Sequence, residues 1–194
     1  MTKPTLSLYP VSLTAKSGDI VAVDLILSSH DNPIVSVDSF IFYDASMLAV
    51  VNPASPDVNK SALFESVGAK VSEPGTLYVY AINSKGATAQ SGKIATFYLQ
   101  AQKTGITELK ILCSQVDKSS QIIGNDKEFS NIIDCKKTSF HTATVNIGMG
   151  DNILGASDRV MTPSVMVLIG VTLIGVAVFT MLVFKYKNLI KKIK

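Results

Sequence analysis

The sequence predicts an all-β protein, an antiparallel β-sandwich, followed by a single C-terminal transmembrane helix. Most of the chain alternates apolar and polar residues with a period of two, and the alternating runs are separated by clusters of turn-forming residues. Near the end, an uncharged apolar block of membrane-spanning length is followed by lysines. Hydrophobic residues make up 47% of the 194 residues and charged residues only 17%, which fits one ordinary domain plus an apolar segment.

The alternating runs predict about seven to nine short strands. In residues 19–28, Val21, Val23, Leu25 and Leu27 share one side, with Ile20, Asp24 and Ile26 among the residues on the other. Further strands are expected at 6–9, 34–43, 76–82, 93–102, 107–113 and 142–147. Gly, Pro, Asn, Asp and Ser clusters at 16–19, 31–33, 73–75 and 83–86 supply the turns. We therefore expect a sandwich domain over residues 4–147.

Residues 161–184 are expected to form the transmembrane helix. They contain no charged residue and exceed the roughly 20 residues that span the hydrocarbon of a bilayer. A buried core helix is the alternative. Residues 148–160, rich in glycine, would be a short stalk, and residues 185–194 a basic cytoplasmic tail. Because lysines beside a span stay on the cytoplasmic side, the sandwich is expected outside the cell.

Charge is unevenly distributed. Up to residue 160 the chain carries 13 basic and 15 acidic residues, a formal charge of −2, whereas the tail adds five lysines and no acid. The domain therefore offers no basic stripe for phosphate contacts, and nucleic-acid binding is not expected.

Two features bear on export. The N-terminal ten residues lack a charged segment followed by an apolar one, so the chain is expected to be a mature or truncated form, or else a tail-anchored protein with a cytosolic domain. Two cysteines in an exported domain often form a disulfide, and no metal-binding spacing is present. We predict a Cys113–Cys135 bridge, with two unpaired buried thiols as the alternative.

No catalytic machinery, metal site or cofactor is expected. The four glutamates, Glu65, Glu73, Glu108 and Glu128, lie in predicted turns or at strand edges and are not paired as in a glycosidase. His30 and His141 are far apart and accompany no hydrolase motif. The triplet Asn59-Lys60-Ser61 fits an N-glycosylation sequon, a pattern that also occurs by chance.

Alternation within residues 34–43 predicts an unusual surface. It places Ser36, Asp38, Phe40 and Phe42 on the side opposite Val37 and Ile41. Two large aromatic side chains on an outer face are rare unless a partner or another segment covers them. Tyr78 and Tyr80 alternate in the same way and would extend the patch. The alternatives are that loops cover this face or that the register is shifted by one residue, which would turn every side chain to the other face.

Four segments together resemble the cohesin domain: LSLYPVSLTAKSGDIVAVDLIL, FIFYDASMLAVV, GTLYVYAINS and GKIATFYLQAQKTGITELKI. The resemblance covers residues 6–147. Its most specific matches are Tyr43-Asp44 with Leu48, and Gly92 with Ile94, Ala95 and Phe97. Ala45 stands where the family customarily has proline.

The resemblance implies a jelly-roll-like sandwich of about nine strands that binds dockerin modules of secreted enzymes. It also implies that the strand before Tyr43-Asp44 contributes to recognition, with Ser36 and Asp38 at the polar positions and Ser36 replacing the common asparagine. The expected function is therefore a membrane-anchored extracellular module that docks a dockerin-like protein. The alternatives are a carbohydrate-binding module for polysaccharide, in which Tyr78, Tyr80 and the phenylalanines stack on sugar rings, and a structural protomer of a surface layer or membrane complex.

Overall fold

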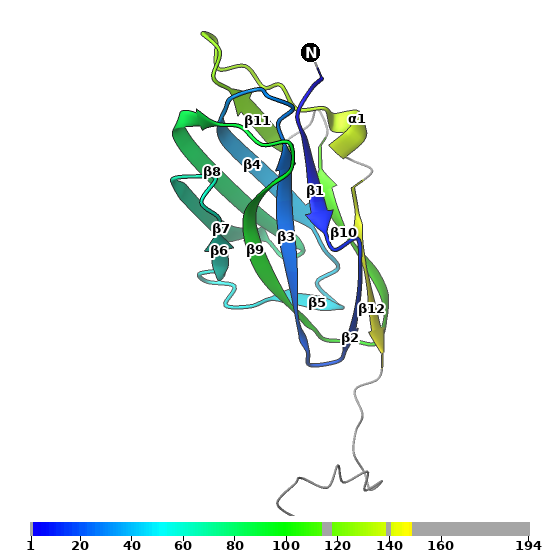
Figure 1. Ribbon diagram of the computed structural model, residues 1–194. Helices are drawn as coiled ribbons and strands as arrows, with labels where there is room; N and C mark the ends of the chain where they lie inside the picture. Colours follow the sequence, from blue (N-terminus) through cyan, green and yellow to red (C-terminus); the bar gives the residue numbers. More distant parts are fainter. Residues whose placement is uncertain (1, 114–117, 139–140, 149–194) are drawn as a thin grey trace, which may run out of the picture. The chain divides into compact units, whose positions relative to one another are not determined.

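The computed structural model describes residues 2–113, 118–138 and 141–148, which form twelve strands and one short helix (Figure 1). The elements are β1 (Thr5–Tyr9), β2 (Ser12–Lys16), β3 (Ile20–Ser28), β4 (Ile34–Phe42), β5 (Leu48–Val50), β6 (Val58–Lys60), β7 (Ser66–Glu73), β8 (Thr76–Ala87), β9 (Gly92–Ala101), β10 (Gly105–Leu112), β11 (Gln121–Gly124), α1 (Cys135–Thr138) and β12 (Ala143–Gly148).

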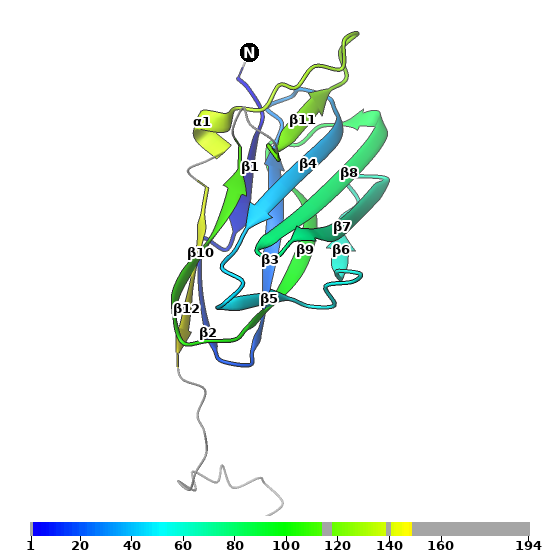
Figure 2. The same cartoon turned by 180° about the vertical axis from the view of Figure 1, so that it is seen from behind.

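The strands form two sheets that pack face to face. One sheet has the order β1-β3-β9-β5, with β6 also paired to β9. The other has the order β2-β12-β10-β4-β8-β7, with β11 also paired to β4. Figures 1 and 2 show the two layers from opposite sides. The predicted all-β sandwich is therefore confirmed. Among these strands only β2 and β12 pair in parallel, a departure from the predicted antiparallel pattern.

The core lies between the sheets and follows the alternation in the sequence. In β3, Val21, Val23, Leu25 and Leu27 are all buried, whereas Asp24 on the other side of the strand is half-buried. The second sheet contributes buried apolar side chains from four strands: Val37 and Ile41, Leu77 and Val79, Leu109 and Ile111, and Val145 and Ile147. Burying these side chains supplies the main favourable free energy of the fold.

Strand β4 occupies a central place in the larger sheet. Its whole length pairs with β8 on one side. On the other side its residues Phe40–Phe42 pair with β10, and its earlier residues pair with β11. The outward side chains of β4 are therefore flanked by three other strands, which places them in the middle of a continuous surface.

A disulfide joins Cys113 to Cys135, the expected pairing, with 5.3 Å between the Cα atoms. The two cysteines are 22 positions apart in the sequence, and the loop that the bridge closes contains β11. Just after the bridge, the Leu6 backbone N–H donates to the buried Thr138 hydroxyl at 3.2 Å. The bridge therefore fixes the segment carrying β11 near β1 and β10.

The described sandwich begins at Thr5 and ends at Gly148, close to the predicted limits of 4 and 147. Within the described residues, no helix is long and apolar enough to cross a membrane. Three predicted segments lie outside the described residues: the stalk after its first residue, the transmembrane helix at 161–184 and the basic tail.

Candidate binding face

The candidate face is formed first by β4. Val37, Ser39 and Ile41 point into the core, and the side chains that alternate with them point outward. Ser36, Asp38 and Phe40 are half-buried, and Phe42 is 45% exposed. The register is the predicted one, and it turns both phenylalanines away from the core.

Strand β8 adds a second outward row in register with the first. Tyr78 lies opposite Phe40, Tyr80 opposite Asp38, and Ile82 opposite Ser36. The Phe40 and Tyr78 ring centroids are 4.8 Å apart, and those of Tyr78 and Tyr80 are 5.8 Å apart with an interplanar angle of 28°. Such spacings are typical of favourable aromatic pairs. Three rings therefore form one ladder across two strands.

The middle ring of this ladder, Tyr78, carries a polar anchor. The Tyr78 hydroxyl donates a short hydrogen bond to Asp38 Oδ1. Burial raises the pKa of the Tyr78 hydroxyl well above its usual range, and the bond to the Asp38 carboxylate raises that pKa further. The hydroxyl therefore remains protonated and donating through the physiological range. The Tyr78 ring is held in one orientation by packing and by this bond.

Strand β7 extends the face beyond β8. Gly68 lies opposite Tyr80, and Lys70 lies opposite Tyr78 with its Nζ 5.3 Å from the ring centroid, within cation–π range. A Cβ added at Gly68 would overlap the hydroxyl and ring of Tyr80. The hydroxyl end of Tyr80 therefore lies against the β7 backbone at Gly68, and any side chain at position 68 would have to displace it.

Strands β10 and β11 border the other side of β4. Lys110 and Leu112 of β10 lie opposite Phe42 and Phe40, and Gln121 and Ile123 of β11 lie opposite Asp38 and Ser36. Lys110 is ion-paired with Glu108 at 2.8 Å. The Phe40 backbone N–H donates to the Ser120 hydroxyl at 3.0 Å, which ties the start of β11 to the ladder.

We call the outward surface of these strands the aromatic face. Its members are Ser36, Asp38, Phe40, Phe42, Gly68, Lys70, Tyr78, Tyr80 and Ile82. All six residues predicted for the site lie together on it. Gly68, Lys70 and Ile82 were not predicted. The available signal was the weak alternation in residues 66–73, where Val67 and Val71 are the only large apolar residues and Gly68 and Lys70 lie on the opposite side of the strand from them.

The aromatic face has one carboxylate, Asp38, which accepts a hydrogen bond from Tyr78, and its most exposed large hydrophobic side chains are Ile82 and Phe42 at 49% and 45%. In the part of the chain that the structure describes, no group of three His, Cys, Asp or Glu residues is placed to hold a metal ion.

Comparison with solved structures finds the same fold in cohesin modules. The seventh ScaB type I cohesin from Pseudobacteroides cellulosolvens is 15% identical, with a TM-score of 0.60 over 80% of this chain and 99% of that one. The sixth cohesin of scaffoldin B from Acetivibrio cellulolyticus, solved in complex with a Cel5 dockerin mutant, is 18% identical, with a TM-score of 0.55 over 76% and 100%.

A non-cellulosomal cohesin from the hyperthermophilic archaeon Archaeoglobus fulgidus is 17% identical, with a TM-score of 0.54 over 76% of this chain and 92% of that one. No protein-family model matches the chain, and no curated protein matches it in sequence. At these identities the likeness shows the fold: the chain has the cohesin fold.

Proposed function

We propose that this cohesin-fold chain is a non-catalytic docking module that binds a dockerin-like protein through its aromatic face, at the outer surface of a membrane. The observation that carries the proposal is the ladder of Phe40, Tyr78 and Tyr80, flanked by exposed Phe42 and Ile82. Contiguous apolar surface of this kind, bordered by polar groups, is typical of protein-binding sites.

Rigidity of the ladder supports this function. Tyr78 is fixed by the Asp38 bond and by two neighbouring rings, and Tyr80 is fixed against Gly68. Side chains that are already ordered lose little conformational entropy when a partner binds. The face can therefore convert buried aromatic area into affinity, while Asp38 and Lys70 orient the partner through polar contacts.

The same packing favours a protein over a polysaccharide. A sugar ring stacks on a free aromatic face, but the Tyr78 ring contacts Phe40 and Tyr80 and has Lys70 over it. Solved structures of this fold support a dockerin-like partner, because several of them are cohesin–dockerin complexes, including one from Acetivibrio cellulolyticus and one from Clostridium thermocellum.

Membrane attachment is supported by the sequence. Residues 161–184 are uncharged, and lysines follow directly at 185 and 187. The Cys113–Cys135 disulfide suits an oxidising compartment, which supports a position of the sandwich outside the cell.

Binding of the full chain in nanodiscs to purified dockerin modules from the same genome tests the proposal, with insoluble and soluble polysaccharides assayed in parallel. We expect saturable binding to a dockerin module and no retention by polysaccharide. Retention by polysaccharide alone would contradict the proposed partner class. Self-association without dockerin binding would favour a structural protomer instead.

Gly68→Ala tests whether the position of Tyr80 against Gly68 contributes to partner affinity. The new methyl group must push the Tyr80 ring off β7, so we expect partner affinity to fall by roughly tenfold, about 1.4 kcal/mol. The measurement is a titration of both variants by calorimetry.

Tyr80→Ala supplies the control for this prediction. With Tyr80 removed, a methyl group at position 68 has no ring to displace, so Gly68→Ala should have no further effect in the Tyr80→Ala background. Equal losses from Gly68→Ala with and without Tyr80 would contradict this role for the glycine.

A further inference from the structure

A second surface of the sandwich carries the Asn59-Lys60-Ser61 triplet, the single Asn-x-Ser/Thr triplet in the 194 residues. Asn59 and Lys60 lie in β6, a strand of three residues whose pairing partner is β9, and Ser61 follows it directly. Val58 is half-buried against the core, whereas Asn59 and Lys60 are exposed. The acceptor asparagine is therefore on the outside of the sheet, where a bulky modification can be accommodated.

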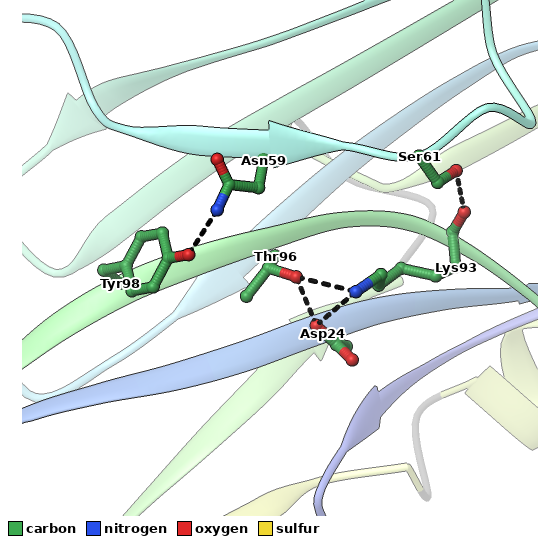
Figure 3. Close-up of polar contacts among 6 residues, drawn as sticks. All are labelled: Asp24, Asn59, Ser61, Lys93, Thr96 and Tyr98. Atoms are coloured by element: carbon green, nitrogen blue, oxygen red, sulfur yellow. Dashed lines mark hydrogen bonds and ion pairs between the residues drawn. The ribbon is translucent and has the colours of Figure 1, made fainter.

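The Asn59 side chain lies along the outward face of β9. Its Nδ2 donates a short hydrogen bond to the Tyr98 hydroxyl, as Figure 3 shows. Beside it, Thr96 donates to Asp24, and Lys93 Nζ lies 3.6 Å from Asp24 Oδ1. The amide nitrogen thus points across a polar surface, next to an aromatic ring that can contact a first sugar.

Ser61, the hydroxyl residue of the triplet, is engaged in the folded chain. Its Oγ donates a short hydrogen bond to the Lys93 backbone carbonyl, which is drawn in Figure 3, and accepts from the Leu63 N–H at 3.2 Å. An enzyme that reads this hydroxyl must therefore act before β6 pairs with β9. β6 pairs with β9 through three residue pairs, and the Ser61 backbone N–H donates to the Ile94 carbonyl just beyond them, so the enzyme must act before these contacts form.

The position of Asn59 is also compatible with partner binding at the aromatic face. β6 and β9 belong to the sheet opposite the one that carries the aromatic face. Figures 1 and 2 show β9 on one layer, with β4 and β8 on the other, and β6 at the edge beside β7. A glycan at Asn59 would extend from the far side of the sandwich and leave Phe40 and Tyr78 free for a partner.

We infer that Asn59 is an N-glycosylation site. This inference rests on the export of the sandwich that the proposed function includes. The donor class is an oligosaccharide on a polyprenyl diphosphate. Asn59 Nδ2 attacks the anomeric carbon, an N–C bond forms, the bond from that carbon to the diphosphate oxygen breaks, the amide loses one proton, and the lipid diphosphate leaves.

Peptide mass spectrometry of the full chain, purified from the membranes of its own host, tests the inference. We expect a sugar mass on the peptide containing Asn59, conversion of Asn59 to Asp on enzymatic release of the glycan, and no modification in Asn59→Gln or Ser61→Ala. Ser61→Thr keeps the sequon, so it should keep the glycan. Equal melting temperatures of the variants after deglycosylation would show that the substitutions leave the fold intact.

Protease added to intact cells separates the two ways in which the inference can fail. An unmodified Asn59 peptide from a domain that the protease digests would overturn glycosylation but leave the docking module outside the cell. A domain that the protease spares would overturn both the export and the glycan. A sugar mass that persists in Asn59→Gln would place the modification elsewhere and also overturn the assignment.

Discussion

Alanine at Phe40 is expected to weaken partner binding by roughly 30-fold or more, about 2 kcal/mol, which is the loss typical of a central aromatic residue in an interface. Phe40 lies near the C-terminal end of β4, and its ring centroid is 4.8 Å from that of Tyr78. Removing it takes away apolar contact area and also frees the Tyr78 ring. Combining Phe40→Ala with Asp38→Ala, which removes the acceptor of the Tyr78 hydroxyl, should abolish detectable capture.

Phe129→Ala is the matched control for this prediction. Phe129 is 60% exposed and lies outside the aromatic face, so the same truncation there should leave affinity unchanged. Thermal unfolding of Phe40→Ala separates lost binding from lost folding, and Phe40→Leu should restore part of the affinity. Unchanged binding by the Asp38→Ala, Phe40→Ala double variant, with the fold intact, would contradict the site.

Loss of the disulfide is expected to destabilise the sandwich by about 3 kcal/mol, the loop-closure term for a loop of this length. The bridge closes a separation of 22 residues and secures the segment that supplies β11. The expected fall in melting temperature is roughly 10 °C. Calorimetry of the Cys113→Ser, Cys135→Ser double variant measures it, and partner affinity should fall with it because β11 borders Asp38.

Reducing agent supplies the control for the disulfide. It should lower the melting temperature of the parent protein to that of the double serine variant and leave the variant unaffected. If the parent and the serine variant unfold at the same temperature under oxidising conditions, the bridge does not stabilise the fold.

The sandwich and most of the aromatic face could be predicted because both depend on alternation with a period of two. Residues 19–28 and 34–43 contain enough large apolar side chains for the buried side of each strand to be identified, and this placed Asp38 and Phe40 outward. The described residues form twelve strands, more than the seven to nine expected, and β2 and β7 lie outside the predicted runs. The short strands β5, β6 and β11 offer too few residues for a pattern.

The remaining features depend on contacts between distant parts of the chain. In residues 66–73 only Val67 and Val71 are large and apolar, so β7 could not be recognised, and with it the roles of Gly68 and Lys70 were missed. Likewise, the division of β4 between β10 and β11, and the parallel pairing of β2 with β12, are set by sheet packing rather than by local sequence.

Hydrogen–deuterium exchange of the full chain with and without a bound dockerin-like partner tests most directly whether the aromatic face is the docking site. Binding is expected to slow exchange in peptides covering 36–42, 66–73 and 76–82 and to leave exchange in β3 and β9 unchanged. Protection confined to β3 and β9, with none across β4 and β8, would contradict it.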